Sequence, residues 1–238
     1  MSLLSIHQIS KIFPDHDTFV HAVVNVSLEL PAGKMVAIVG PSGSGKTTLL
    51  NIMGLLIPPD AGQVIVDGHE TKDLTDRKRC RMRNKYFGYI VQDFALIETE
   101  TALKNILVPT LYTEDRQPAR AYRPLIEAVS EHLQIQDKLH RKVSQLSGGE
   151  RQRVAIIRSI VCGQRIILAD EPTGSLDQDN AKIVVSYLRQ LVDEEEKTVV
   201  LVTHDLHLAS QCDLIYQLKG GQLSPASLNL DDLEYLLK

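Results

Sequence analysis

Eight residues near position 40 combine glycines, a lysine and hydroxyls in an order that suits phosphate binding. They fit the pattern GxxxxGK[ST] and run Gly40-Pro41-Ser42-Gly43-Ser44-Gly45-Lys46-Thr47. The glycines let backbone N–H groups converge on a phosphate without a Cβ in the way, and Lys46 adds a positive charge. The hydroxyl of Thr47 is a ligand that suits Mg²⁺. The segment therefore predicts a phosphate-binding loop that ends in a metal ligand.

The elements on either side of this loop fit the same interpretation. Residues 35–39 (MVAIV) are short, apolar and bounded by glycines, which predicts a buried strand, and residues 47–56 predict the start of a helix. A helix N-terminus adds the positive end of a dipole to the loop. A chance glycine-rich turn is the alternative, and the lysine and both flanks argue against it.

Two acids end a second apolar run, residues 165–169 (RIILA). Asp170 stands at the end of this predicted strand, where a carboxylate can approach Mg²⁺, usually through water. Glu171 points elsewhere and can polarise a water for in-line attack on a γ-phosphate. Taken alone, these two residues are explained equally well as an ordinary acidic junction between a strand and a loop.

A second glycine-rich segment, Ser147-Gly148-Gly149-Glu150, leads directly into the helix-like run 151–162. A helix N-terminus of this kind can receive an anion, although an ordinary loop and helix cap explain it as well when it is taken alone. Two phosphate-receiving loops beside one catalytic set suggest a dimer. Each subunit would then offer its Ser-Gly-Gly segment to the γ-phosphate held by its partner.

Gln92 and His204 each follow a predicted strand, residues 86–91 and 198–202 respectively. An amide in that place can ligate a metal or orient water, and an imidazole can donate a hydrogen bond to a γ-phosphate. A lone Gln or His is usually structural. Ligands of open α/β sheets, however, gather at the carboxyl ends of strands, and that shared placement favours a functional role for both residues.

The composition is typical of a globular protein that does not bind nucleic acid. The 238 residues are 43% hydrophobic and 24% charged, and the net charge of −4 gives no general attraction to nucleic acid. Cys80, Cys162 and Cys212 lack metal-ligand spacing and predict free thiols. We find no apolar run long enough to cross a bilayer and no signal peptide, so we expect a cytoplasmic chain.

The order of predicted elements indicates a single α/β domain with a helical insertion. Antiparallel strands are expected within residues 3–30, and a hairpin is expected at Asp67-Gly68. We expect a β subdomain and an α/β core from residues 1–93 and 161–223, and a helical subdomain from 94–160. A tail, residues 224–238, carries leucines at helical spacing from position 230 onward, with Asn229 as the N-cap.

Together these motifs resemble the nucleotide-binding subunit of ATP-binding cassette (ABC) transporters. The resemblance spans about residues 3–223 and rests on the phosphate loop, Gln92, LSGGE, ILADEP, the segment Ser175-Leu176-Asp177 and His204. It implies a P-loop NTPase with a RecA-like core, an N-terminal antiparallel β subdomain and a helical insertion. It also implies that the chain binds ATP and Mg²⁺ and forms a head-to-tail homodimer with two ATP molecules sandwiched at the interface.

The resemblance assigns roles to individual residues. It implies that Glu171, His204 and Lys46 are catalytic. It implies that Phe13 stacks on adenine and that Asp177 contacts the partner's phosphate loop. It implies a nucleotide-binding set made of Phe13, Gly40, Ser42, Gly43, Ser44, Gly45, Lys46, Thr47, Thr48, Gln92, Ser147, Gly148, Gly149, Glu150 and Asp177. The implied Mg²⁺ ligands are Thr47, Gln92 and Asp170. Glu150 replaces the commoner glutamine and puts a negative side chain near the partner's γ-phosphate.

Finer features resemble the MacB/LolD-like group of this family, among them EPTGSLD and GLLIPPDAGQVIVDG. That resemblance implies a separately encoded, MacB-like permease and a place on the inner face of the membrane through it. We therefore expect export of a peptide, a lipoprotein or an antimicrobial compound. The alternative is a non-transport ABC ATPase that drives a mechanotransmission complex of the cell-division type, which the sequence of the ATPase alone separates poorly from an exporter.

Overall fold

The computed structural model describes residues 2–16, 18–115, 117–174 and 176–226. The chain divides into two compact units, residues 1–79 with 198–238, and residues 80–197. The leucine-bearing tail helix expected from Asn229 lies outside the described residues. The subdomain boundaries expected from the sequence stay a prediction.

An antiparallel sheet in the first unit follows the order β2-β1-β4-β5. Its two long strands pair with each other as far as Asp15 and Thr18. β4 and β5 meet at the expected Asp67-Gly68 hairpin, where both residues have positive φ, 50° and 77°, as a two-residue hairpin turn requires. The four strands are β1 (Ser2–Asp15), β2 (Thr18–Pro31), β4 (Ala61–Val66) and β5 (His69–Glu70).

The first unit also contains a group of strands in the order β10-β9-β3-β8, of which β3 and β8 form the buried centre. β3 pairs in parallel with both β8 and β9, and every residue of β3 and β8 is buried. Strands covered on both faces read as continuous apolar runs, which is why the sequence predicted β3 and β8 correctly. These strands are β3 (Met35–Val39), β8 (Thr198–Val202), β9 (Leu214–Lys219) and β10 (Gln222–Pro225).

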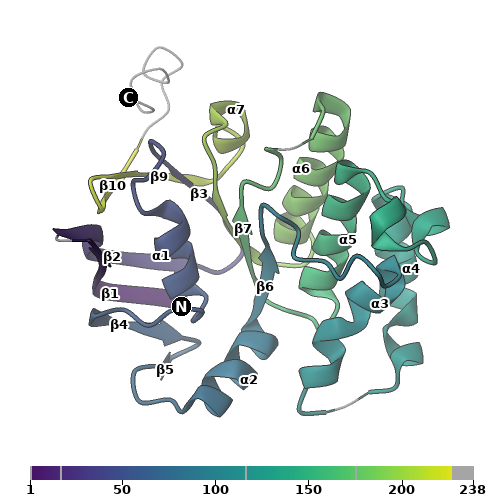
Figure 1. The fold of residues 1–238 in the computed structure, drawn as a ribbon, viewed down its shortest axis with the longest axis horizontal. Coiled ribbons are helices and arrows are strands. Elements are labelled where there is room, and N and C mark those ends of the chain that lie inside the picture. The colour runs from purple at the N-terminus through teal and green to yellow at the C-terminus, as the bar shows by residue number, and fades with distance from the viewer. Residues whose placement is uncertain (1, 17, 116, 175, 227–238) are drawn as a thin grey trace. The chain divides into compact units, whose positions relative to one another are not determined.

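Two helices of the first unit follow β3 and β8. α1 (Lys46–Met53) buries Leu49, Leu50, Ile52 and Met53 and lies against β1 and β2, as Figure 1 shows. α7 (Leu206–Ala209) is a single turn that follows β8. The phosphate-loop candidate therefore sits on a helix whose apolar face is anchored in the core of its own unit.

The second unit joins two parallel strands to a group of helices (Figure 1). β6 (Phe87–Ile90) pairs with β7 (Ile166–Asp170), and α5 (Gly148–Ile160) packs on β6. Gly88 permits this approach, because a Cβ there would lie 1.9 Å from the carbonyl oxygen of Ser159. The other α-helices are α2 (Asp76–Tyr86), which begins in the first unit, α3 (Ala102–Leu107), α4 (Arg123–His132) and α6 (Gln178–Asp193).

Four short 3₁₀ helices connect the larger elements of this second unit. They are η1 (Val108–Tyr112), η2 (Ala119–Tyr122), η3 (Gln136–Lys138) and η4 (Val143–Gln145). Within the described ranges, no helix has the length and apolar character that crossing a membrane requires.

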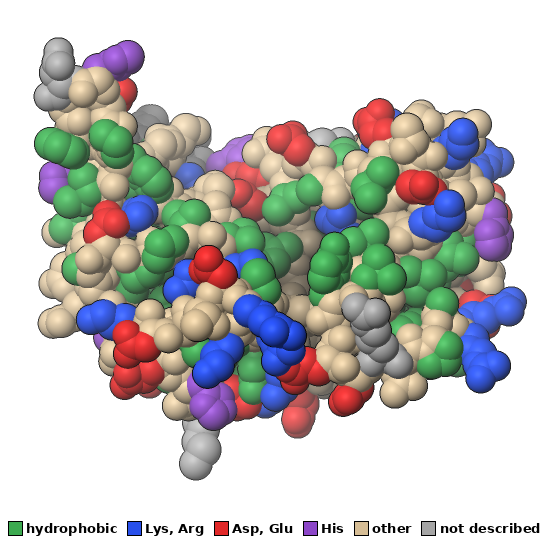
Figure 2. Space-filling model, turned by 60° about the horizontal axis from the view of Figure 1, so that its bottom comes forward, with side chains coloured by type: hydrophobic (Ala, Val, Ile, Leu, Met, Phe, Trp, Pro, Cys, Tyr) green, Lys and Arg blue, Asp and Glu red, His purple; other side chains and the backbone are tan. Residues whose placement is uncertain are grey.

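Large apolar side chains remain exposed on the segment from Ile97 to η1. Ile97, Leu111 and Tyr112 are 50%, 61% and 69% exposed. The same segment lines a hollow of about 290 Å³ whose walls are Ile97, Glu100, Lys104, Leu107, Val108 and Leu111. Figure 2, which brings the bottom of Figure 1 forward, shows hydrophobic side chains on the surface among charged ones. Exposed apolar groups in this arrangement are typical of an interaction surface.

Candidate phosphate-binding and catalytic site

The loop between β3 and α1 has a backbone that only glycine can adopt at its tightest points. Gly40 and Gly45 have φ of 154° and 99°. A Cβ on Gly45 would lie 1.9 Å from the carbonyl oxygen of Ala22, and one on Gly40 would lie 2.2 Å from that of Leu218. Both approaches are impossible for a side chain, so the glycines predicted from the motif are required by the fold as well.

This loop offers hydrogen-bond donors to an anion. Among the described residues no side chain caps the start of α1, and its first turn carries no acid. The Ser44 hydroxyl oxygen is buried without a hydrogen-bond partner in the described part of the chain. Lys46 Nζ donates to the carbonyl oxygens of Gly40 and Pro41, both at 2.9 Å, which keeps the ammonium group beside the loop. Helix N–H groups, a buried hydroxyl and an ammonium together fit a polyphosphate.

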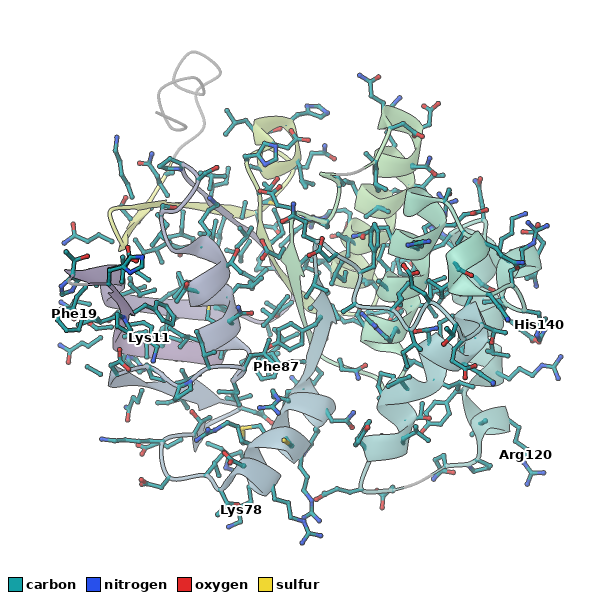
Figure 3. The ribbon with its side chains drawn as sticks, in the orientation of Figure 1. Lys11, Phe19, Lys78, Phe87, Arg120 and His140 are labelled. Carbon is teal, nitrogen blue, oxygen red and sulfur yellow. The ribbon has the colours of Figure 1, made fainter. Side chains whose placement is uncertain are left out.

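Other candidates in the first unit occupy the places that the sequence predicted. Thr47 and Thr48 lie in the first turn of α1, and Thr47 is exposed. Phe13 lies on β1 and is 38% exposed, with Lys11 Nζ 5.5 Å from its ring centroid. Figure 3 shows Lys11 on this sheet, and Lys11 is also paired with Asp60 at 2.7 Å. Phe13 thus presents an aromatic surface that suits stacking.

His204 lies two residues beyond the end of β8 and is exposed. The next residue, Asp205, caps α7 by accepting hydrogen bonds from the backbone N–H groups of His207 and Leu208. The N–H of Asp205 in turn donates to the hydroxyl of Thr203 at 2.9 Å. The chain on both sides of His204 is therefore held in place by local hydrogen bonds.

In the second unit, Asp170 is the last residue of β7, as expected, and Glu171 has an unusual backbone. The φ of Glu171 is 49°, which places a non-glycine residue in the left-handed region. That conformation costs about 1–2 kcal/mol and is concentrated at functional sites. The turn that follows is closed by a hydrogen bond from the Gly174 N–H to the Glu171 carbonyl, at 3.2 Å. Sequence patterns predicted the residue, but not its strained backbone.

Gln92 follows β6, and the segment after it is held by a residue that the sequence analysis missed. Phe94 and Ala95 both have positive φ, 58° and 47°. Arg158 on α5 donates to both of their carbonyl oxygens, at 2.7 Å for Phe94. Burial lowers the pKa of Arg158. The available signal was an arginine inside the apolar run 154–161, where a charge needs a buried partner.

The second glycine-rich segment starts α5, as the sequence predicted, and its own side chains cap it. The Ser147 hydroxyl accepts from the Glu150 N–H at 3.3 Å, and the Glu150 carboxylate accepts from the Ser147 N–H at 2.7 Å. This reciprocal pair is a capping box. Ser147 and Glu150 therefore already satisfy N–H groups that an incoming phosphate would use.

Asp177 caps α6 and is fixed by Asn180. Its Oδ1 accepts from the backbone N–H of Asn180 at 2.8 Å, and its Oδ2 accepts from the Asn180 side-chain amide at 2.7 Å. Hydrogen bonds from the backbone and then the side chain of Asn180 are the main causes that lower the pKa of Asp177. Asp177 is thus held as a carboxylate at the start of a helix. The sequence analysis did not single out Asn180.

Each unit therefore gathers its own part of the predicted set. The first unit holds Phe13, the loop Gly40–Thr47, Thr48 and His204, and the second holds Gln92, the segment Ser147–Glu150, Asp170, Glu171 and Asp177. The assigned roles of these residues stay predictions.

Comparison with protein families and curated sequences places the chain among known proteins. A family model described as "ABC transporter" matches residues 23–174. The macrolide export ATP-binding/permease protein MacB of Aggregatibacter actinomycetemcomitans is 40% identical over 223 residues, which cover 94% of this chain and 34% of that protein. MacB of Brucella melitensis is 38% identical over 221 residues, 93% of this chain and 34% of that protein. The chain thus spans about a third of the length of these relatives.

Solved structures show the same architecture. A dimeric post-hydrolysis state of the ATP-binding cassette MJ0796, bound to ADP and phosphate, matches with a TM-score of 0.88 and 34% identity. The match covers 95% of this chain and 99% of that one. A second dimeric structure of MJ0796, described as a bacterial ABC transporter cassette, matches with the same TM-score and 35% identity.

Proposed function

The chain belongs to the ABC transporter family, and from that premise we propose that it is the ATPase subunit that drives a transporter. The family and the α/β P-loop fold predicted from the sequence are both confirmed. The observation that carries the proposal is the loop before α1. Gly40 and Gly45 leave no room for a side chain, the helix start has no side-chain cap among the described residues, and the buried Ser44 hydroxyl has no partner there.

ATP is the proposed ligand of this loop. The backbone N–H groups of residues 42–48 would surround the β-phosphate, and the Lys46 ammonium would lie between the β- and γ-phosphates. Phe13 would stack on the adenine ring, since its ring is partly exposed and Phe offers the same stacking surface as the commoner Tyr. Every one of these groups comes from the first unit.

Hydrolysis is the proposed reaction. Glu171 would take a proton from a water as that water attacks the γ-phosphorus, and the bond to the oxygen that bridges the β- and γ-phosphates would break. The products are ADP and inorganic phosphate. His204 would donate a hydrogen bond to the γ-phosphate. The oxygen donors Thr47, Gln92 and Asp170 suit a hard cation, so they would hold Mg²⁺, which neutralises charge on the phosphates.

A homodimer is the proposed active form. The cassette MJ0796, which has a closely similar fold, is dimeric in both of its matched structures. In the proposed dimer, Ser147, Gly148 and Gly149 of one subunit would face the γ-phosphate bound by its partner, and Asp177 would contact the partner's phosphate loop. Glu150 would place a carboxylate beside the same γ-phosphate.

A membrane permease is the proposed partner. The MacB relatives are ATP-binding/permease proteins, and this chain matches about a third of their length. We therefore propose a separately encoded, MacB-like permease that holds the chain at the inner face of the membrane. The exposed apolar segment from Ile97 to η1 and its hollow would receive a permease helix. The proposed cargo is a peptide, a lipoprotein or an antimicrobial compound.

Steady-state ATP hydrolysis tests the proposed reaction. We expect Glu171→Gln to lower turnover by about 100-fold or more while ATP binding persists, because a positioned general base contributes that much. Glu131→Gln, the same change at an exposed position of α4, is the matched control and should hydrolyse at the wild-type rate. Turnover of Glu171→Gln close to that of Glu131→Gln would contradict the role of Glu171.

Membrane capture tests the proposed partner. The Glu171→Gln protein, held with Mg-ATP, is used as bait on solubilised membranes of the native host, and the bound chains are identified by mass spectrometry. We expect a permease among them, and we expect Leu111→Asp in the same bait to lose it. Capture of soluble proteins alone would contradict the proposed transporter.

A further inference from the structure

Side chains of α5 hold the connection between β7 and α6 at two points. Gln152 is buried and its amide donates to the carbonyl oxygen of Pro172 at 2.8 Å. Arg153 donates to the side-chain oxygen of Asn180, in the first turn of α6. The connection that carries Glu171 and Asp177 is therefore tied at both ends to the helix that begins after Ser147.

Asn180 uses both halves of its side-chain amide in this arrangement. Its Oδ1 accepts from Arg153, and its Nδ2 donates to Oδ2 of Asp177 at 2.7 Å. The cap of α6 needs only the backbone N–H of Asn180, which donates to Oδ1 of Asp177 and which almost any residue could supply. The contacts of the Asn180 side chain with Arg153 and Asp177 are therefore not required for capping α6.

Asn180 also lies directly against the segment Ser147–Glu150, which we call the signature segment. A Cβ built on Gly149 would be 3.1 Å from the Asn180 Cγ and 3.3 Å from both atoms of its amide. Such contacts are tighter than ordinary van der Waals packing, so the missing side chain of Gly149 lets Asn180 approach the backbone of α5.

The charge of Arg153 favours a fixed geometry. Arg153 is 8% exposed, and burial lowers its pKa, whereas the carboxylates of Glu150 and Asp177 act in the opposite sense and favour its charged form. A largely buried cation is stable only if its partners stay in place, so movement of Asn180 or Asp177 relative to α5 is costly. Glu150 belongs to the capping box of Ser147. The charges of Glu150, Arg153 and Asp177 therefore link the start of α5 to the start of α6.

From these contacts we infer that Asn180 is a positioning residue. It fixes the Asp177 carboxylate relative to the segment Ser147–Glu150. Asp177 and that segment would then meet a partner's nucleotide together, as one rigid piece. The inference rests on the proposed ATP-bound dimer. Asn180 itself touches no nucleotide in this account, and it acts through Asp177.

Dimer affinity in the Glu171→Gln background with Mg-ATP, measured by sedimentation, tests this role. Asn180→Asp keeps an oxygen for Arg153 but loses the donor to Asp177 and adds a repulsive charge. We expect the dimer dissociation constant to rise about tenfold, the size of one hydrogen bond to a charged group. Gln178→Ala, an exposed neighbour in the same helix turn, is the control and should leave the constant unchanged.

A double-mutant cycle separates positioning from a purely structural role. If Asn180 acts through Asp177, Asn180→Asp should have no further effect on dimer affinity once Asp177→Ala is present. Full additivity of the two substitutions would overturn the inference, and so would a dissociation constant for Asn180→Asp equal to that of Gln178→Ala. Failure of the Glu171→Gln parent to dimerise would instead contradict the proposed function.

Two measurements guard against a folding defect. Monomeric ATP binding depends on the loop before α1, so Asn180→Asp should bind ATP as tightly as the parent does. Hydrogen exchange on the parent needs no further variant. On addition of Mg-ATP, the amides of residues 147–153 and 176–181 should be protected together. Protection of one segment without the other would overturn the inference.

Discussion

α1 and α5 each begin at a glycine-rich segment, and the two starts are built in opposite ways. α1 begins at a loop whose glycines have positive φ, and within the described residues no side chain caps it. α5 begins at Ser147, whose hydroxyl and N–H form a reciprocal capping box with Glu150. The first start keeps its N–H groups for a ligand, and the second satisfies them with its own residues. Similar composition therefore serves two different purposes.

The difference has a consequence for the proposed cycle. An anion can enter the start of α1 without displacing any capping side chain of the described residues. A γ-phosphate that reaches the start of α5 meets the carboxylate of Glu150, which accepts from the Ser147 N–H at 2.7 Å. We therefore expect strong binding of ATP by the monomer, and a weaker, more easily reversed contact by the signature segment of the partner.

The largest expected difference between the two starts is in their tolerance of alanine. Gly45→Ala would force a Cβ to 1.9 Å from the Ala22 carbonyl at a φ of 99°, so we expect it to lower the unfolding free energy by more than about 2 kcal/mol and to abolish ATP binding. Gly148→Ala meets no atom of the described residues within 4 Å and should fold normally. Thermal unfolding measures the stability of each variant, and equilibrium titration measures its affinity for ATP. Similar losses of stability and of ATP binding in Gly45→Ala and Gly148→Ala would contradict the difference between the starts of α1 and α5.

A smaller effect is expected from a cation placed at the second start. Ser147→Arg should weaken ATP-dependent dimerisation of the Glu171→Gln protein by more than about tenfold, because a bulky side chain would occupy the partner's phosphate position. Loss of the cap alone should cost about 1 kcal/mol in folding. Gel filtration with Mg-ATP measures the dimer, and unchanged ATP binding by the monomer is the control. Dimerisation at the level of the parent would argue against the sandwich arrangement.

The smallest effect is expected from neutralising the second start. Glu150→Gln keeps an oxygen that can accept from the Ser147 N–H, but it removes the charge that faces the γ-phosphate. We expect the dimer to become a few-fold tighter, with a larger gain at low salt, because helix-terminal charge effects are worth about 0.3–1 kcal/mol and are screened. Sedimentation at two salt concentrations measures the change. A weaker dimer would show that the carboxylate assists the contact.

Sequence patterns predicted the parts of the fold that depend on local chemistry. The strands β3, β7 and β8 are continuous apolar runs, and the hairpin at Asp67-Gly68 uses residues suited to positive φ. β9 and β10 were missed, although Gly220-Gly221 between them is a hairpin signal and both glycines have positive φ. β9 is only partly buried along most of its length and β10 is an exposed edge strand, so neither has the strong apolar pattern of a central strand.

The candidate site was predictable where a motif carries it, and not where partners come from distant parts of the chain. The phosphate loop, Asp170, Glu171 and the signature segment stand at the element ends that their spacing indicated. The roles of Arg158 and Asn180 depend on contacts with residues 63–64 and 27 positions away. The strained backbone of Glu171 likewise follows from tertiary structure, since glutamate has no local preference for positive φ.

The most direct test of the proposed function is the mass of the Glu171→Gln protein by sedimentation, with Mg-ATP, with Mg-ADP and without nucleotide. We expect about twice the monomer mass with Mg-ATP and the monomer mass in the other two conditions, because only the γ-phosphate completes the contact with the partner's signature segment. A monomer in all three conditions, from protein shown to bind ATP, would contradict the ATP-sandwiched dimer on which the proposed mechanism depends.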